Sequence, residues 1–357
     1  MEENKQHKTA LPETEPIPSA QAPEALLDIR DLRVEYHTDE DVVYAVNGLD
    51  LTIGKGESLG LVGETGAGKT TTALSVLRLI ADPPGKIMGG EIWFEGEDML
   101  QAKPARLREI RGSKISVIFQ DPMTSLNPVY SVGDQIAEVI HQHEKCSKEE
   151  GRRKAGDMLE MVGIPRARYD EYPHQFSGGM KQRVVIAMSI ACSPELILAD
   201  EPTTALDVTI QAQVLELMNE LKEKLRTSLL LITHDLGVVA QVCDRVAIMY
   251  AGEIVESGTI AEVFDHPHHP YTIGLFGSIP SLDETAEKLK PISGQMPDPT
   301  ELPEGCAFAP RCPYATGACR TRKPEMTGVG GTQMVRCLAH QGVFESPKLM
   351  EEVRHGR

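Results

Sequence analysis

The chain has 357 residues, with 53 acidic against 36 basic side chains, which gives a net charge of −17 and a pI near 5.1. Contact with nucleic-acid phosphates needs clustered Lys and Arg, so this balance argues against a nucleic-acid partner. No apolar run approaches the roughly 18 residues that span a bilayer, and the N-terminus lacks the features of a signal peptide. We expect a cytosolic main domain with an appendage, which reaches a membrane only by docking on other proteins.

The N-terminal third begins with residues 1–25, which are rich in Glu, Pro, Gln and Ala and are expected to form a disordered tail. Residues 27–36 then alternate between apolar and polar side chains, and residues 42–46 resume this pattern after a polar turn. Residues 89–96 add a further apolar segment of similar length. Such short alternating runs predict a small antiparallel sheet.

Residues 63–71 contain every fixed position of a phosphate-binding loop, between an apolar strand at 58–62 and a helix that continues through 72–77. Glycines let the backbone wrap around a phosphate, Lys69 reaches the β and γ oxygens, and the Thr70 hydroxyl can ligate Mg²⁺. We therefore expect a nucleoside triphosphate to bind at Gly63, Glu64, Thr65, Gly66, Ala67, Gly68, Lys69, Thr70 and Thr71.

Two further segments, 196–199 and 229–232, are continuously apolar, as strands buried on both faces of a parallel sheet are. Residues 210–225 between them have the spacing of a crossover helix. Asp200 and Glu201 directly follow the first strand, so their side chains can take different tasks. We expect Asp200 to assist Mg²⁺ and Glu201 to polarise the attacking water; alone, such a pair could equally be a solvated turn.

Together with Phe-Ser-Gly-Gly-Met-Lys-Gln-Arg at 176–183, these motifs resemble the nucleotide-binding subunits of ABC transporters over about residues 26–265. The resemblance implies an α/β fold of the P-loop ABC ATPase type, with a RecA-like core and an antiparallel β subdomain. It also implies a helical signature subdomain at about 121–190. The signature residues expected to act on ATP held by a facing subunit are Ser177, Gly178, Gly179 and Met180.

The same resemblance implies roles for single residues. Gln120 matches the glutamine that reaches metal and attacking water, and His234 matches the switch histidine at the γ-phosphate. Asp207 matches the loop that crosses the dimer interface. Tyr36 lies where the family stacks an aromatic ring on adenine, with Tyr44 as the alternative. The implied catalytic set is Gln120, Glu201 and His234, and the implied Mg²⁺ set is Thr70, Gln120 and Asp200.

Several features resemble one branch of this family. Phe176 and Met180 replace the usual Leu and Gln, as in one of the two ATPases of peptide importers, which implies a heterodimer with a second, homologous ATPase. Residues 121–128 are similar to the loop that, with the following helices, receives a permease helix in that branch. Residues 266–272 resemble the start of an extension found on oligopeptide, dipeptide and nickel import ATPases. The three histidines there are interpreted as structural rather than metal-binding, since two prolines stiffen the run.

Four of the seven cysteines, at 306, 312, 319 and 337, lie within the expected extension at 266–345, which precedes a tail at 346–357. Cytosolic thiols so grouped favour a soft metal over disulfides. Zinc and an iron–sulfur cluster both suit four thiolates, although the spacing lacks Cys-x-x-Cys pairs. The resemblance favours a [4Fe–4S] cluster held by Cys306, Cys312, Cys319 and Cys337, with a structural role in the extension. Zinc and unliganded thiols are the two alternatives.

The expected function is that of an ATP-hydrolysing subunit which powers an ABC importer for oligopeptides or dipeptides. Its implied partners are the second ATPase, two membrane permeases and, indirectly, a peptide-binding protein, at the cytoplasmic face of the membrane. Nickel or another small solute is the alternative cargo. A soluble, non-transport ABC ATPase is a more distant alternative, because no coiled-coil insertion, second cassette or basic face is present. An iron–sulfur redox protein would need a flavin or dinucleotide fingerprint, which is also missing.

Overall fold

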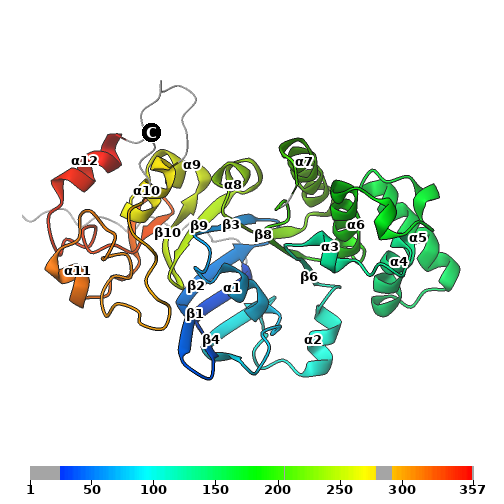
Figure 1. Cartoon of the computed structure of the whole chain (residues 1–357), viewed down its shortest axis with the longest axis horizontal. Helices are drawn as coiled ribbons and strands as arrows, with labels where there is room; N and C mark the ends of the chain where they lie inside the picture. Colours follow the sequence, from blue (N-terminus) through cyan, green and yellow to red (C-terminus); the bar gives the residue numbers. More distant parts are fainter. Residues whose placement is uncertain (1–24, 205, 279–291, 356–357) are drawn as a thin grey trace, which may run out of the picture.

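The computed structural model describes residues 25–204, 206–278 and 292–355, which form two β-sheets flanked by helices (Figure 1). The smaller sheet is antiparallel and matches the one predicted from the alternating segments. Nearly all of the tail predicted at 1–25 lies outside the described residues. The order of strands in this sheet is β2 (Val42–Gly54), β1 (Ala25–His37), β4 (Gly85–Phe94) and β5 (Glu97–Asp98).

The larger sheet has eight strands and is mixed. Its neighbours from β9 to β6 are parallel, whereas β10, β11 and β12 join by antiparallel pairing. The predicted α/β class with buried parallel strands is therefore confirmed. Across this sheet the order is β11 (Thr327–Gly330), β12 (Gln333–Val335), β10 (Glu253–Thr259), β9 (Arg245–Tyr250), β3 (Ser58–Val62), β8 (Ser228–Thr233), β7 (Leu196–Asp200) and β6 (Ile115–Ile118).

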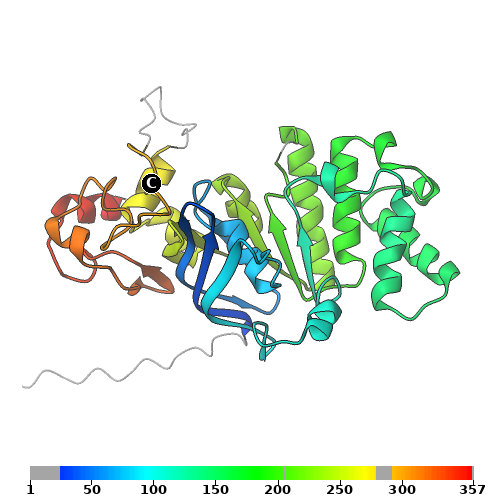
Figure 2. The same ribbon diagram turned by 60° about the horizontal axis from the view of Figure 1, so that its bottom comes forward.

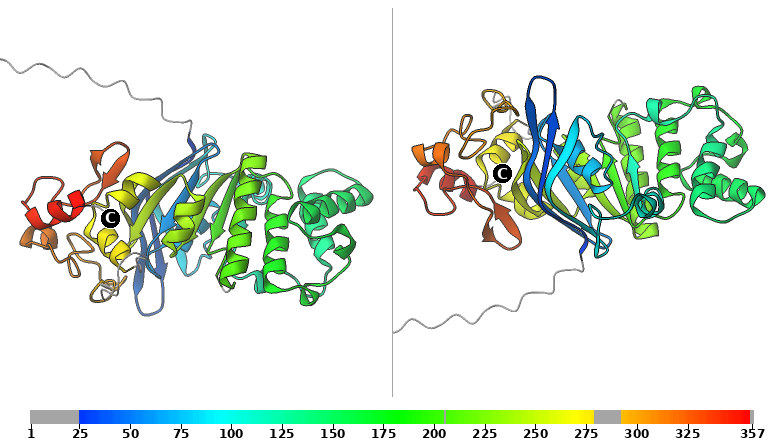
Figure 3. Two further views of the ribbon diagram at one scale, coloured as in Figure 1. Left: turned by 90° about the horizontal axis from the view of Figure 1, so that it is seen from above. Right: turned by 90° about the horizontal axis from the view of Figure 1, so that it is seen from below.

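The helices fall into three groups along the molecule (Figures 1 and 2). Helices α6 and α7 lie side by side against the parallel strands (Figure 3), and α7 is the crossover helix expected between β7 and β8. None of the described helices is long and apolar enough to cross a bilayer. The central helices are α1 (Lys69–Val76), α2 (Pro104–Ile110), α6 (Gly178–Ile190), α7 (Val208–Leu225) and α8 (Leu236–Val242). The helices between β6 and the signature are α3 (Pro122–Ser125), α4 (Val132–His143) and α5 (Lys148–Met161), with short 3-10 turns at Arg166–Arg168 and Pro173–Gln175. The C-terminal helices are α9 (Ile260–Asp265), α10 (Pro270–Gly277), α11 (Gly317–Thr321) and α12 (Pro347–His355).

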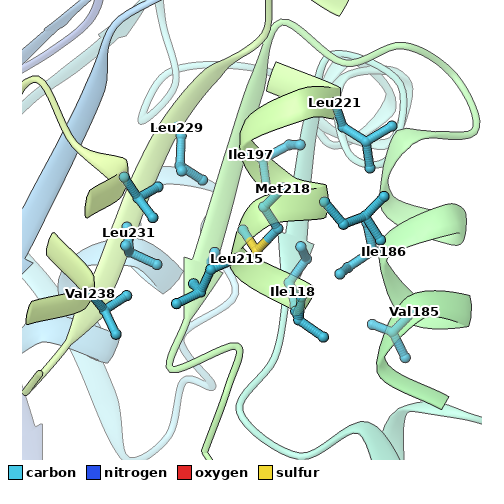
Figure 4. Close-up of a cluster of buried hydrophobic side chains, with 14 of the residues drawn as sticks. Ile118, Val185, Ile186, Ile197, Leu215, Met218, Leu221, Leu229, Leu231 and Val238 are labelled. Atoms are coloured by element: carbon cyan, nitrogen blue, oxygen red, sulfur yellow. The ribbon is translucent and has the colours of Figure 1, made fainter. Parts of the chain in front are cut away.

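Strands β7 and β8 carry apolar side chains on both faces because each is covered on both sides. On one face Ile197 and Leu229 pack with Met218 of α7 and Ile186 of α6 (Figure 4). On the other face Leu198, with other β7 and β8 side chains, packs against α1 and the antiparallel sheet. This two-sided burial explains why these strands lack polar alternation.

The C-terminal extension shares the core of the ATPase body. Phe308 is 2% exposed, and its ring packs edge-on against Tyr250 of β9, with centroids 5.2 Å apart. Tyr271 of α10 completes this group, 4.7 Å from Tyr250. Large aromatic side chains contribute strongly to cohesion when buried in this way. The extension is thereby fixed to the end of β9, beside the phosphate loop.

A buried carboxylate also joins the extension to the sheet. Glu256 of β10 is 0% exposed and accepts hydrogen bonds from the backbone N–H groups of His268 and His269, at 2.7 and 2.9 Å. Gln333 of β12 donates a third at 2.8 Å. Burial raises the pKa of Glu256 to about 7, although these donors act in the opposite direction. His269 in turn caps α10, since its Nδ1 accepts from the N–H of Tyr271.

We expect protonated Glu256 to contribute stability that is complete below about pH 4.5 and is lost as the pH rises through about 7. Stability falls as the pH rises because the folded chain holds this proton more tightly than the unfolded chain does. Denaturant unfolding at several pH values should show a steeper decline between these limits in the unaltered chain than in Glu256→Gln. Equal slopes for the two proteins would contradict this assignment.

Candidate functional site

The phosphate-binding loop follows β3 and ends where α1 begins, as its sequence predicts. Gly66 and Gly68 have φ values of 87° and 104°, which side chains rarely tolerate. A Cβ atom at Gly68 would lie 2.3 Å from the carbonyl oxygen of Ala45, and one at Gly63 would lie 2.2 Å from that of Met249. Glycine is thus favoured at Gly66 by conformation, at Gly63 by a close backbone contact, and at Gly68 by both.

Lys69 lies at the start of α1 and is 7% exposed. Its Nζ donates hydrogen bonds to the carbonyl oxygens of Gly63 and Glu64, at 2.8 and 3.1 Å. Burial lowers the pKa of Lys69, and the negative charges of Glu201, Asp200 and Glu64 oppose that shift. The ammonium group is therefore held inside the loop and surrounded by acids, where it can contact phosphate oxygens.

Asp200 and Glu201 point to different partners, as expected of adjacent residues at a strand end. Asp200 is 7% exposed and shares a hydrogen bond with the Thr70 side chain. Burial raises the pKa of Asp200, and the bond to Thr70 opposes this. A carboxylate and a hydroxyl oxygen side by side suit Mg²⁺, which prefers oxygen ligands. Thr70 and Asp200 are therefore suitable residues to hold the metal.

Glu201 is the centre of a hydrogen-bonded group. Its Oε2 accepts from Gln120 Nε2 and from Thr204 Oγ1, both at 2.9 Å, and its Oε1 lies 3.1 Å from His234 Nδ1. Although burial acts to raise the pKa of Glu201, the bonds to His234 and Thr204 lower it overall. The group is thus a charged carboxylate oriented by three neighbours. Gln120 and His234 are among the residues predicted from the sequence, whereas Thr204 is not.

Glu201 also has a φ of 45°, in the left-handed region that few residues other than glycine adopt. Its backbone N–H donates to the carbonyl oxygen of Ile232 in β8 at 2.8 Å, which fixes the turn. Backbone strain of this kind is found where a fixed side-chain direction is needed. Here it directs the carboxylate toward Gln120 and His234.

An open cavity of about 460 Å³ runs from this carboxylate along the phosphate loop. Tyr36 lines it and shares a hydrogen bond with Thr71, 3.2 Å between the two oxygens, whereas Tyr44 is not among the lining residues. Of the nine predicted loop residues, Gly63, Glu64 and Ala67 do not line the cavity either. The full lining consists of Tyr36, Val43, Ala45, Thr65, Gly66, Gly68, Lys69, Thr70, Thr71, Gln120, Glu201, His234 and Pro299.

The signature residues do not contribute to this cavity. Ser177 is the N-cap of α6, and its hydroxyl accepts from the N–H of Met180 at 3.4 Å. Ser177 and Gly178 are exposed, and the close contact of Gly179 with Ile210 of α7 leaves no room for a Cβ. Asp207 caps α7 by accepting from the N–H of Ile210 at 3.0 Å. Within one chain, the signature and the phosphate loop therefore form separate surfaces.

Contacts from the extension were not predicted. Arg311 Nη1 lies 3.0 Å from both carboxylate oxygens of Glu64, and Pro299 lines the cavity. Glu64 was expected to contact phosphate through the loop, but its carboxylate is bonded to Arg311. No local pattern links these residues, because 247 positions separate Glu64 from Arg311.

The four clustered cysteines do not form a ready metal site. Among residues 25–204, 206–278 and 292–355, no group of three or more His, Cys, Asp or Glu side chains is arranged to hold a metal ion. Backbone N–H groups nevertheless face three of the sulfurs, those of Cys306, Cys312 and Cys337. Burial raises the pKa of Cys306 to about 11 and that of Cys312 to about 12. The predicted cluster is therefore not confirmed by the placement of these side chains.

Two family models match the chain. Residues 46–204 match the model described as "ABC transporter", and residues 255–319 match "Oligopeptide/dipeptide transporter, C-terminal region". The first region contains the phosphate loop, the signature and the acid pair. The second begins in β10 and includes Cys306, Cys312 and Cys319.

Curated relatives resemble nearly the whole chain. The oligopeptide transport ATP-binding protein OppD of Bacillus subtilis is 51% identical over 87% of this chain and 88% of its own length. The dipeptide transport ATP-binding protein DppD of the same organism is 48% identical over 88% of this chain and 94% of its own length.

Solved structures of ATP-binding cassettes are also similar to this chain. A dimeric post-hydrolysis form of the ATP-binding cassette MJ0796, bound to ADP and Pi, is 28% identical with a TM-score of 0.59. It covers 66% of this chain and 98% of that one. These matches confirm the predicted ABC ATPase fold. The chain belongs to the ABC transporter family, in its group of oligopeptide and dipeptide transport ATP-binding proteins.

Proposed function

We propose that this chain is the ATP-hydrolysing subunit that powers import of oligopeptides or dipeptides by an ABC transporter. The observation that carries the proposal is the convergence of Gln120, Glu201 and His234 at one end of the cavity that the phosphate loop lines. The names of the curated relatives favour peptides over nickel or another small solute as cargo. Their resemblance also favours a transporter subunit over a soluble ABC ATPase.

In this proposal the residues divide the work of hydrolysis. Lys69 and the loop amides bind the β- and γ-phosphates, while Thr70, Asp200 and Gln120 would hold Mg²⁺, which would neutralise charge at the phosphate oxygens. Tyr36 contacts adenine. Glu201, kept charged by its neighbours, orients the attacking water and accepts its proton. His234 holds that carboxylate and contacts the γ-phosphate.

We further propose that a second, homologous ATPase completes the site. Ser177 and Gly178 are exposed at the N-terminus of α6, where a hydroxyl and backbone amides can receive an anion, yet they lie outside their own chain's cavity. A facing subunit would supply the phosphates they contact. The dimeric state of MJ0796 agrees with such an arrangement, and Phe176 and Met180 favour a non-identical partner.

We also propose that the chain docks on two membrane permeases, which would hold it at the cytoplasmic face of the membrane. Val129 and Tyr130 are 72% and 54% exposed, next to the loop at 121–128 that resembles a permease-binding loop. Exposed apolar side chains of this size are typical of interaction sites. A peptide-binding protein would meet the permeases rather than this chain.

We also propose that the extension binds a metal. Residues 266–345 contain four cysteines, and backbone N–H groups that face sulfur suit bound thiolates. No ligand group is formed among the described side chains as placed, so the proposal of a [4Fe–4S] cluster or of zinc rests on the four cysteines and these N–H groups. The metal would staple the extension and has no part in hydrolysis.

Replacing the proposed general base tests the catalytic assignment. Glu201→Gln should lower kcat for ATP hydrolysis by about 100-fold or more, because the amide cannot accept the proton of the attacking water. ATP binding should persist, since the loop is unchanged. Steady-state hydrolysis and equilibrium ATP binding measure the two effects. The control is Glu216→Gln, an exposed residue of α7; hydrolysis by Glu201→Gln at the rate of this control would refute the role.

Metal analysis tests the extension. Protein purified without oxygen should contain about four irons with matching sulfide and a broad visible absorption band, both abolished by Cys312→Ser. Cys146→Ser is the control, because this cysteine lies in the helical region far from the group in sequence. Zinc in place of iron would identify the alternative metal. Protein free of both metals would reject a metal-binding role.

A further inference from the structure

The C-terminal extension contacts the phosphate loop through a shielded ion pair. Arg311 Nη1 lies 3.0 Å from Oε1 and from Oε2 of Glu64, and their side chains are 6% and 33% exposed. Opposite charges interact more strongly where water is partly excluded. A further hydrogen bond holds the Arg311 side chain, because its Nε donates to the carbonyl oxygen of Ser293 at 3.1 Å.

The backbone of the same loop residue is held by a second part of the extension. The N–H of Glu64 donates to the hydroxyl oxygen of Tyr271 at 3.1 Å, and Tyr271 is fully buried in α10. Tyr250 contacts both Tyr271 and Arg311, which lies 3.4 Å from its hydroxyl. Side chain and backbone of Glu64 are therefore both fixed by residues packed with the extension.

A further segment of the extension reaches the cavity itself. The carbonyl oxygen of Pro299 accepts from the N–H of Tyr44 in β2 at 2.9 Å, and Pro299 lines the cavity with Tyr36 and Val43. The Met296 side chain reaches Gly66, where a Cβ would lie 3.2 Å from its terminal methyl. Pro299 thus adds an apolar surface from the extension to the part of the cavity that Tyr36 and Val43 also line.

We propose that the extension is a working part of the nucleotide site: Arg311 is a positioning residue that neutralises and holds Glu64, and Pro299 contacts the purine base. This inference rests on the proposed ATP site. Glu64 is close enough to act on the charge of Lys69, so without Arg311 its carboxylate would repel the triphosphate. The Arg311 cation cancels that charge and keeps the loop in its binding shape.

Charge variants of the full-length chain test the role of Arg311. Arg311→Met should weaken ATP binding about tenfold, because the Glu64 charge is left uncompensated. Glu64→Gln should bind ATP at least as tightly as the unaltered chain, and the double variant should lie within about threefold of it. Titration with ATP gives the Kd values, with Arg320→Met of α11 as the control. A purely structural ion pair would instead weaken binding in both single variants, and that result would overturn the proposal.

The Pro299 contact is tested by base selectivity. Pro299→Ala keeps the carbonyl oxygen that accepts from Tyr44 but removes the ring. It should raise KM for ATP about threefold with kcat within twofold, and should lower the preference for ATP over CTP, whose base is smaller. Pro310→Ala, an exposed proline of the extension, is the control. An unchanged ATP-to-CTP ratio of kcat/KM would exclude the contact with the base.

Failure of this inference is distinguishable from failure of the proposed function. If the unaltered chain binds ATP and Lys69→Ala does not, the ATP site stands. Arg311→Met and Pro299→Ala with unaltered Kd and selectivity would then overturn only the role of the extension. If the unaltered chain does not bind ATP, the proposed function itself fails, and the inference fails with it.

Discussion

The site depends on one constraint: parallel strands that end at the same edge of a sheet. Strand β3 leads into the phosphate loop, β7 ends in Asp200 and continues into Glu201, and His234 follows β8. Because β3, β8 and β7 are direct neighbours in the sheet, residues far apart in sequence come together at this edge. Ligand sites of α/β proteins form at this edge for the same reason.

Burial on both faces makes this edge rigid. One layer of helices and one antiparallel sheet cover the parallel strands, so the strand ends cannot move independently. Glu201 can then hold a left-handed backbone conformation and still accept hydrogen bonds from Gln120 and Thr204. The rigid sheet orients the carboxylate, and its hydrogen bonds keep it charged.

The extension lengthens the same sheet at the side formed by β10. Strands β11 and β12 continue the sheet beyond β10, and the buried Glu256 binds the turn before α10. The aromatic group around Phe308 fixes the extension beside the phosphate loop. We therefore regard the extension as a layer of the ATPase rather than an independent appendage.

Much of the site was predictable because its signals are local. A loop such as 63–71 carries its geometry in consecutive residues, and an apolar strand followed by two acids marks a strand end. The ion pair between Glu64 and Arg311 was not predictable, since neither residue belongs to a pattern that identifies the other. Strands β11 and β12 have four and three residues, too few for a periodic signal.

The metal site predicted at the four cysteines is not confirmed by the structure. Their grouping in sequence suggested a ligand set, but sequence spacing does not fix the positions of sulfur atoms, and the described residues contain no such set. The predicted roles of single residues in hydrolysis follow from geometry and resemblance, and they stay predictions until kinetics are measured.

Peptide uptake by the reconstituted transporter would show whether this chain powers peptide import. Proteoliposomes would contain this chain, its partner ATPase and the permeases, with the ATPase side facing the trapped Mg-ATP and the binding protein on the other side. A labelled oligopeptide or dipeptide should accumulate on the ATPase side only when ATP is present. Uptake without ATP, or ATP-driven uptake of nickel but not of peptides, would contradict this expectation.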